Sequence, residues 1–367
     1  TEGIYGIPLD VSAMIVFLFV LFGSMLDKAG GGKFFIDLAF SLLGRYKGGP
    51  AKAAVLASGM TGLVSGSSIA NTVTTGTFTI PLMKSVGYPD YKAGAVEVAA
   101  STNGQLMPPI MGAAAFIIAE YCNLEYFQVV RAAFIPAIIS YIALIYITHL
   151  EASKLGLKGL SKDQIPHFFK TLLRGLHFLI PMFYLIYELM ILRHSPELAA
   201  YRAILVLAAL IVIQNLVKAY IAKESLLGAI KLSLRQLWDA LVAGGRNMMG
   251  IGVAVSAAGI IVGVVAMGLG GLIVEVIDTI AGGNLVFLLI ITAIASLILG
   301  MGLPTTANYI VMASLTAPVI VTLGADYGLV IPIIAAHLFC FFFGILADDT
   351  PPVGQAAYAT AAIAKSD

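Results

Sequence analysis

The sequence predicts an all-α polytopic membrane protein, and three observations support that class. Hydrophobic residues make up 59% of the 367 positions and charged residues only 11%, whereas a soluble domain carries about 25% charged residues. Several apolar stretches reach the roughly 20 residues that a helix needs to cross a bilayer. Short polar breaks interrupt some of these stretches, at corresponding places in the two halves of the chain. The formal net charge of +1 gives no indication of nucleic-acid binding.

Residues 1–50 are expected to form part of a scaffold, with an apolar span at 10–26 and a short or interfacial helix at 33–46. Residues 51–86 are apolar but broken at 65–72, and each arm is too short to cross a bilayer alone. Lysines lie at both ends of this segment, which places both ends on one side of the membrane. We therefore expect a re-entrant hairpin at 51–86, followed by a broken helix at 93–121. Together they form a first transport repeat, 51–121.

The second half of the chain is expected to repeat this arrangement from the opposite face. Residues 127–246 would supply scaffold helices and a cytoplasmic amphipathic arm, and 247–283 one further scaffold span. A hairpin at 284–323 and a broken helix at 329–364 would then form a second transport repeat, 284–364. Because no Lys or Arg occurs between Arg246 and Lys365, this hairpin should enter from the outside. Two such repeats of opposite orientation are typical of secondary transporters.

Individual residues support the repeat. At one constant spacing, Asn71 aligns with Asn308, Pro81 with Pro318, and Gly87 with Gly324. Each hairpin tip is also followed by a second break that ends in two prolines, at 108–109 and at 351–352.

The breaks are the candidate binding site, because backbone groups freed inside a membrane must be satisfied by protein or ligand. Hydroxyl and amide oxygens are hard ligands that suit Na⁺. The N–H groups at the start of a half-helix suit a carboxylate. Na⁺ would be held by Ser68, Asn71, Thr305 and Asn308. The full set of candidate ion and substrate ligands is Ser65, Ser67, Ser68, Asn71, Thr72, Asn103, Gly104, Gly302, Thr305, Thr306, Asn308, Asp348, Asp349 and Thr350.

Asp348 and Asp349 are the sharpest single signal, because carboxylates at membrane depth are rare and mostly functional. A buried carboxylate takes up a proton or is held charged by a nearby cation. A break close to the membrane surface would instead leave both solvated. Glu97 lies at a similar depth in the first broken helix and is a weaker candidate. His337 is expected to be a packed, hydrogen-bonded histidine rather than a proton relay.

Three other interpretations compete. A cluster of small polar residues can serve helix packing alone, although its repetition in two hairpins argues against that. An intramembrane aspartyl enzyme would need two carboxylates facing one site, and adjacent helical positions point about 100° apart. A simple channel is the third interpretation, and substrate counterflow, which a pore does not show, would separate it from a transporter.

The chain resembles the large membrane subunit (M, DctM-like) of tripartite ATP-independent periplasmic (TRAP) transporters, in particular the TAXI-type fused permeases. The resemblance covers nearly the whole chain. It rests on VTTGTFTIPLM at 73–83, AASTNGQLMPPIMGAAAF at 99–116, AGIIVGVV at 258–265 and LGMGLPTTA at 299–307.

The resemblance implies an elevator-type secondary transporter of the ion transporter superfamily type, not an enzyme. Such a protein would import an organic acid (carboxylate) solute, fed by a periplasmic substrate-binding protein. It would lie in a bacterial or archaeal cytoplasmic (inner) membrane. A small Q-like membrane subunit would accompany it, and a fused copy would precede Thr1. No cofactor is expected beyond the coupling ion, and no Walker motif indicates direct use of ATP.

The chain departs from the family pattern at one point that concerns the coupling ion. Asp348-Asp349 stands before the second Pro-Pro break, where a neutral lead-in is expected. These carboxylates could bind a proton. Na⁺ remains the expected coupling ion, and symport with H⁺ is the alternative.

Overall fold

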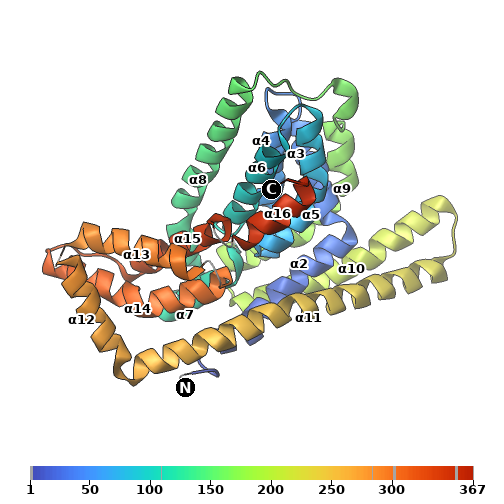
Figure 1. Cartoon of the computed structure of the whole chain (residues 1–367). Coiled ribbons are helices and arrows are strands. Elements are labelled where there is room, and N and C mark those ends of the chain that lie inside the picture. Colours follow the sequence, from blue (N-terminus) through green and yellow to red (C-terminus); the bar gives the residue numbers. More distant parts are fainter. Residues whose placement is uncertain (1–2, 109, 283, 301–302, 352–353, 367) are drawn as a thin grey trace.

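The computed structural model describes residues 3–108, 110–282, 284–300, 303–351 and 354–366. All regular structure in these ranges is helical (Figure 1). Within them, six helices are long and apolar enough to cross a membrane: Ile7–Ala29, Tyr126–Lys154, Lys162–Ile191, Pro196–Ala222, Leu226–Gly268 and Thr305–Asp326. The prediction of an all-α polytopic membrane protein is confirmed.

The first repeat contains two pairs of helices, each pair separated by a short break. Helices α4 (Gly49–Ser65) and α5 (Ser68–Ser85) pack side by side as a helical hairpin. Helix α6 (Asp90–Gly104) follows, and α7 (Gly112–Cys122) begins after the Pro-Pro break. All four lie where the sequence places a hairpin and a broken helix.

The second repeat has the same order of elements. Helix α13 (Leu285–Gly300) packs against α14 (Thr305–Asp326), and α15 (Ile333–Leu346) follows. A short 3₁₀ turn, η5 (Ala347–Asp349), ends α15, and α16 (Gln355–Ala364) begins after the second Pro-Pro break. The 3₁₀ turn carries both aspartates of the predicted site.

The remaining helices surround the repeats. The chain starts with α1 (Ile7–Val11), η1 (Ser12–Val16) and α2 (Phe17–Ala29), then α3 (Gly31–Leu43). The middle of the chain forms α8 (Tyr126–Lys154), η2 (Lys162–Gln164), α9 (Phe168–Ile186), η3 (Tyr187–Ile191), α10 (Pro196–Ala222), α11 (Leu226–Val264), η4 (Val265–Leu269) and α12 (Gly270–Ala281). Helix α2 packs against α10 and α11.

The boundary expected between 246 and 247 is not a helix end. Helix α11 runs without interruption through Arg246 and crosses the lower part of Figure 1 as one long rod. The change from basic residues to an uncharged stretch indicates a change of environment along the helix. No proline stands at this boundary, and Gly244 and Gly245 both remain within the helix, so the backbone continues. The chain bends only at Gly268, whose φ of 117° is left-handed.

The half-helix after each break packs against the other repeat. Helix α7, from the first repeat, contacts α14 and α15, while α16, from the second, contacts α5 and α6. In Figure 1, α16 lies beside α5 and α6, far from α13. The two repeats therefore build one interlocked body, and the breaks lie where they cross.

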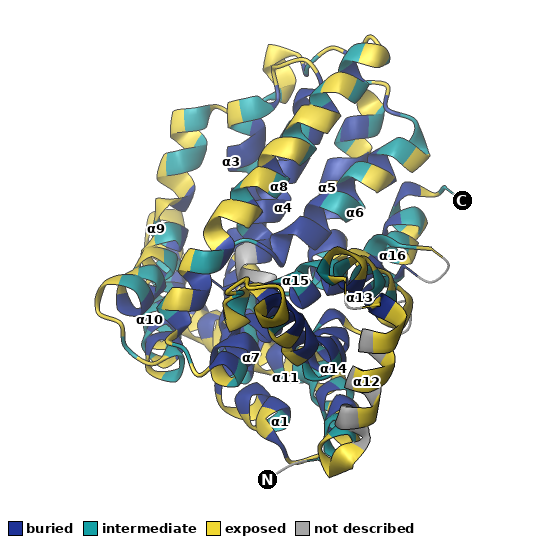
Figure 2. Cartoon of the chain, turned by 90° about the vertical axis from the view of Figure 1, so that its left-hand side faces the viewer, coloured by how far each residue is buried: buried dark blue, intermediate teal, exposed yellow. Residues whose placement is uncertain are grey.

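Burial separates the first hairpin from the outer helices. The apolar face of the outer helices is exposed: Ile135 on α8, Leu173 on α9 and Val253 on α11 are each more than 60% accessible. Figure 2 shows exposed residues along α8 and α12 and mostly buried ones along α4 and α5. In the second hairpin, α14 is largely buried, but α13 exposes one apolar face that includes Val286 and Ile298. Exposed apolar surfaces of this kind suit lipid.

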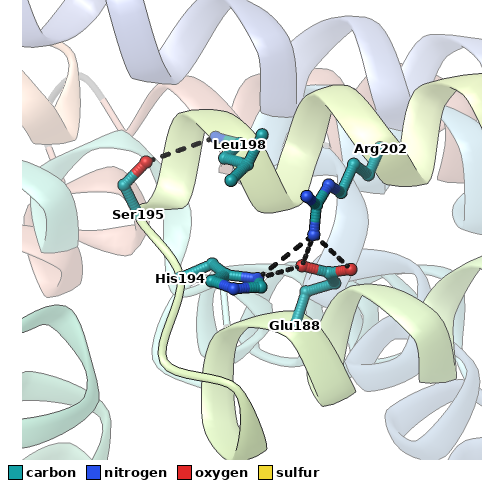
Figure 3. A network of polar contacts seen from close by, with 5 residues as sticks. All are labelled: Glu188, His194, Ser195, Leu198 and Arg202. Atoms are coloured by element: carbon teal, nitrogen blue, oxygen red, sulfur yellow. Dashed lines mark hydrogen bonds and ion pairs between the residues drawn. The ribbon is translucent and has the colours of Figure 1, made fainter.

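A polar network closes the turn between α9 and α10 (Figure 3). Glu188, which is only 2% exposed, lies in the π-helical turn η3. Its Oε2 is 2.5 Å from His194 Nδ1 and accepts a hydrogen bond from Arg202 at 3.0 Å. Ser195 caps α10 by accepting from the Leu198 N–H. The network therefore joins the end of one predicted span to the start of the next.

Candidate functional site

Asp348 joins the two hairpin tips. Its Oδ2 accepts hydrogen bonds from Ser68 Oγ at 2.6 Å and from Thr305 Oγ1 at 2.9 Å. Gln105, from the first Pro-Pro break, approaches the same oxygen at 3.5 Å. The side chain is 4% exposed. The alternative in which both aspartates are solvated is therefore wrong for Asp348, whereas Asp349 is only partly buried.

The two hydroxyl donors hold equivalent positions in the repeats. Ser68 is the first residue of α5 and Thr305 the first residue of α14. They stand at the same spacing as Asn71 and Asn308. Two helix N-termini therefore converge on one carboxylate, with their partial positive charge directed toward it. A single acid from the second break ties both tips together.

A small cavity lies at this junction. Its volume is about 90 Å³, and its wall includes Ser68, Gln105, Thr305, Thr306 and Asp348. Scaffold residues of η1 and α2, including Phe19 and Val20, close the other side. Polar groups from both repeats thus face one shared space.

A larger cavity adjoins the first. Its volume is about 260 Å³, and it separates α5 from the scaffold helices α2, α3 and α11. Asn71 and Thr74 line one wall, and Ser24, Lys28 and Asn247 line the other. Val20, Ser67 and Ile251 belong to the walls of both cavities. The junction therefore opens toward the end of α2 that carries Lys28.

The tip asparagines mainly hold their own hairpins. Asn71 Nδ2 donates to the Ser58 carbonyl at 2.9 Å, and its Oδ1 accepts from Thr61 at 2.5 Å. Asn308 Nδ2 donates to the carbonyls of Ser296 at 2.9 Å and Gly344 at 3.2 Å. Each amide ties the second arm of a hairpin to the first arm. These hydrogen bonds fix the backbone at the starts of α5 and α14, where Ser68 and Thr305 lie.

The first tip also rests directly on the start of α7. Gly66 and Gly112 both have left-handed φ, 61° and 70°. A Cβ added to Gly66 would lie 3.0 Å from the Cα of Gly112. Two glycines therefore allow the hairpin turn and the first Pro-Pro break to touch.

A second buried acid lies deeper in the first repeat. Glu97, on α6, is fully buried and accepts hydrogen bonds from four hydroxyl groups. Thr79 donates at 2.5 Å, Ser58 at 3.2 Å and Ser101 at 3.3 Å, and Thr75 also donates. We call Glu97, Ser58, Thr75, Thr79 and Ser101 the Glu97 cage.

The other predicted residues fall into four groups. Asp349 and Asn103 lie at the breaks but bond elsewhere: Thr102 donates to Asp349 at 2.5 Å and Ser140 to Asn103 at 3.0 Å. Ser67 caps α5, Gly104 packs against α4, and Thr350 donates to the Leu346 carbonyl. The Ser65 side chain and Gly302 lie outside the described residues. Thr72 is buried at the first tip.

Sequence reasoning missed several members of this arrangement. Gln105 reaches Asp348, and Ser58 and Thr61 secure Asn71. Ser58 and Thr61 lie inside a helix of small residues, where a hydroxyl is usually read as packing. Thr61 lies about one helical turn before the tip and Ser58 about two turns before it. This position was the only signal in the sequence.

Three buried oxygen atoms at or near the tips have no hydrogen-bond partner among the described residues: Thr72 Oγ1, Ser296 Oγ and Asn308 Oδ1. A buried oxygen without a partner is costly, so atoms of this kind are open to a water molecule or an ion. Two of the three belong to the second hairpin. The equivalent amide oxygen of the first hairpin, on Asn71, already has a partner.

This arrangement defines the class of protein. Adjacent acids Asp348 and Asp349 bond to different partners and do not form a paired dyad. The molecule is a helical membrane transporter with a repeated hairpin site rather than an enzyme. The family comparison agrees: residues 4–367 match the DctM component of the tripartite ATP-independent periplasmic transporters. The chain belongs to this family.

Individual relatives agree with the family. The 2,3-diketo-L-gulonate TRAP transporter large permease protein YiaN of Escherichia coli is 24% identical over 96% of this chain and 78% of its own length. A putative TRAP transporter large permease protein of Haemophilus influenzae is 27% identical over 41% of this chain, and the match spans only 35% of that relative. The sialic acid permease protein SiaT of Haemophilus influenzae is 30% identical over 38% of the chain and 22% of its own length.

Proposed function

We propose that this chain is the permease subunit of a TRAP transporter that imports an organic acid by ion-coupled alternating access. The observation that carries the proposal is Asp348, which accepts a hydrogen bond from a hydroxyl group of each hairpin tip at the edge of a small cavity. A site shared by two equivalent hairpins can be approached from either side of a membrane. Release of one tip would open one side while the other stays closed.

The solute class follows from the chemistry of the site and the relatives. The N-termini of α5 and α14 supply N–H groups that suit a carboxylate. Relatives are described as permeases for 2,3-diketo-L-gulonate, sialic acid and C4-dicarboxylate, all of which are organic acids. Lys28 lines the larger cavity beside Asp27, and an anion leaving toward the cytoplasm would pass both.

The coupling ion proposed for the tips is Na⁺. Hydroxyl and amide oxygens of Ser68, Asn71, Thr305 and Asn308 would hold it, together with Asp348. The unpaired oxygens of Ser296 and Asn308 favour the second hairpin as its place. Cation binding there would neutralise Asp348 and complete the site for the anion.

Movement would follow the elevator scheme. The interlocked repeats, 51–121 and 284–364, would move as one transport domain, with both hairpins re-entrant. The scaffold would comprise 1–50, 127–246 and 247–283. A periplasmic binding protein and a small membrane subunit would complete the system in a bacterial or archaeal inner membrane. One relative is described as a DctMQ permease protein.

The test is uptake by the complete transporter in lipid vesicles, with the matching binding protein outside. Labelled succinate, sialate and 2,3-diketo-L-gulonate form the solute panel, and the Na⁺ and pH gradients are varied independently. We expect accumulation of at least one acid that depends on an inward Na⁺ gradient. Absence of accumulation of every acid under every gradient would contradict the proposed function. Accumulation without Na⁺ would contradict only the choice of ion.

A further inference from the structure

The Glu97 cage is an anomaly that the site above does not explain. Glu97 is 0% exposed, and its hydrogen bonds come from hydroxyl groups of α4, α5 and α6. A buried carboxylate normally has a cationic partner or carries a proton. Hydroxyl groups satisfy its oxygens but leave its charge uncompensated.

Charged groups on the surrounding helices are engaged elsewhere. On α4, Lys52 contacts His149 of α8, and on α5, Lys84 pairs with Asp90. Lys92 of α6 pairs with Glu151 of α8. Asp348 and Asp349 of η5 bond to Ser68, Thr305 and Thr102. Tyr141 of α8 and Tyr358 of α16 are not cationic. On α3, which also packs against α4 and α5, Asp37 is an acid and Lys33 is exposed.

The cage has a complete set of hydrogen bonds for either protonation state of Glu97. Each hydroxyl has one proton to donate. Thr75 lies 2.8 Å from the Asn71 carbonyl, and Thr79 lies 3.0 Å from the Thr75 carbonyl. With Glu97 ionised, both threonines donate to the carboxylate. With Glu97 protonated, the acid donates to one threonine, and the threonine hydroxyls turn to the backbone carbonyls.

The protonation state of Glu97 affects the hydrogen bonds next to the first hairpin tip. Ser58 Oγ is 3.2 Å from Glu97 and also accepts from Asn71 Nδ2 at 3.2 Å. Asn71 lines the larger cavity beside the scaffold. A change in the direction of the Ser58 hydroxyl therefore alters the bond that holds the second arm of the hairpin to the first.

We propose that Glu97 is a proton-binding site of the transport domain, and that its proton travels with the solute. The ligand is a proton rather than Na⁺ because the cage oxygens already lie at hydrogen-bonding distance from the carboxylate, and a proton needs no further space. Since Glu97 is sealed from solvent, it exchanges its proton only when the first hairpin shifts. This inference rests on the proposed transport function and adds a second ion to it.

The first experiment detects the proton itself and needs no solute. Infrared spectra of the purified full-length chain in lipid are recorded at neutral pH, with the proton as probe. We expect a carbonyl band of a protonated carboxylic acid that disappears in Glu97→Gln. The matched control is Glu120→Gln, at an exposed glutamate on α7, and it should keep the band. A band unchanged in Glu97→Gln would overturn the proposal.

The second experiment separates proton coupling from a structural role. It uses the complete transporter and whichever acid of the panel the wild type accumulates. Glu97→Gln should keep solute exchange, in which no net proton moves, but lose at least tenfold of the accumulation driven by a pH gradient. Accumulation equal to that of wild type would overturn the proposal. So would loss of exchange in a variant that elutes like wild type, because Glu97 would then only hold the hairpin.

A measurement on the wild type covers the case in which Glu97→Gln does not fold. Solute uptake into vesicles should make the outside medium more alkaline, as followed with a pH-sensitive dye. Solute uptake without alkalinisation would overturn the proton site and leave the proposed transport function standing. If the wild type accumulates no acid at all, the transport function fails, while the infrared spectra still decide the proton site.

Discussion

At the scale of single residues, Asp348 holds both hairpin tips through one oxygen. Asp348→Asn keeps the shape of the side chain. It removes the negative charge and replaces one carboxylate oxygen by an amide group that donates hydrogen bonds. A hydrogen bond to a charged group contributes about 1.5–3 kcal/mol, which corresponds to a loss of roughly 10- to 150-fold in affinity. We expect solute uptake by the variant to fall by about this factor.

Uptake rates at several solute concentrations measure this change. Asp326→Asn is the matched control, because Asp326 lies at the exposed end of α14, away from both tips. Unchanged uptake in Asp348→Asn would show that the carboxylate contributes nothing to solute or ion binding.

The acid in the π-helical turn makes a different contribution. Glu188 accepts from Arg202 with both oxygens and contacts His194 in the turn between α9 and α10 (Figure 3). Because Arg202 and His194 are partly exposed, solvent screens this pair, and its loss costs less than the roughly 3–5 kcal/mol of a fully buried pair. Glu188→Gln should therefore lower the thermal unfolding temperature of the purified protein.

The control is Glu197→Gln, which removes an acid from the next turn without touching the network. We expect Glu188→Gln to reduce uptake only in proportion to the loss of folded protein. A variant with wild-type stability but no uptake would instead give Glu188 a direct part in transport.

Where the signal in the sequence was a break, the structure brings several of the named residues together. Ser68, Thr305 and Asp348 stand at helix ends or at the second Pro-Pro break, where freed backbone groups need partners. Gln105 and Ser58 were missed because an amide beside a proline pair, and a serine among alanines, have many ordinary explanations. Their roles depend on which helix lies opposite, and a sequence does not give that information.

At the scale of secondary-structure elements, α4 and α6 approach each other through glycine. A Cβ added to Gly62 would lie 2.5 Å from the Cα of Gly104, too close for any side chain. Overpacking of this kind costs about 1–3 kcal/mol. Gly62→Ala should therefore separate α4 from α6, weaken the Asn71 contacts and lower both thermal stability and uptake.

Gly245→Ala on α11 is the control, because a Cβ there meets nothing within 4 Å. Thermal denaturation followed by intrinsic fluorescence would compare the two variants. Equal stability would mean that the helices separate at no cost.

The repeat also places two titratable groups at equivalent depths. A Cβ on Gly104 would lie 3.2 Å from Asn71 Nδ2, and one on Gly344 would lie 3.3 Å from Asn308 Nδ2, which matches α6 with α15. Two helical turns before these glycines stand Glu97 and His337. His337 Nδ1 bonds to Tyr309 at 2.8 Å, so it is the packed histidine that the sequence predicts. A glutamate therefore occurs at this depth in the first repeat only. Two of the three unpaired oxygens described above belong to the second hairpin.

The elements themselves were well predicted wherever Gly, Pro or a polar cluster interrupted an apolar run. The hairpins and broken helices follow directly from such interruptions. The boundary predicted at 246 does not coincide with a helix end. Basic residues indicate position relative to the membrane, and they neither cap nor break a helix. The partner exchange of α7 and α16 was beyond prediction, because both half-helices are short and uniformly apolar or small.

At the scale of the whole molecule, the elevator scheme makes a mechanical prediction. A Cβ on Gly32 of α3 would lie 3.4 Å from Cγ2 of Thr74 on α5, close to the separation that a disulfide needs. Gly32→Cys with Thr74→Cys, in a chain whose buried Cys122 and Cys340 are replaced by Ala, should form a cross-link between scaffold and transport domain. Uptake should stop on oxidation and return with reductant.

The two single-cysteine variants are the controls, and both should transport under oxidising conditions. Full uptake by the cross-linked protein would show that α3 travels with the hairpins and would move the domain boundary.

The exchange of half-helices has a consequence for how the protein is made. Helix α7 leaves the ribosome long before α14 and α15, the helices it packs against. Helix α7 can pack early against α1, η1, α4 and α8, but its contacts with α14 and α15 must wait until the C-terminal third has been synthesised. Domains otherwise tend to fold as units, N-terminal first, during synthesis. A ribosome stalled after α12 would therefore leave α7 with only part of its native contacts.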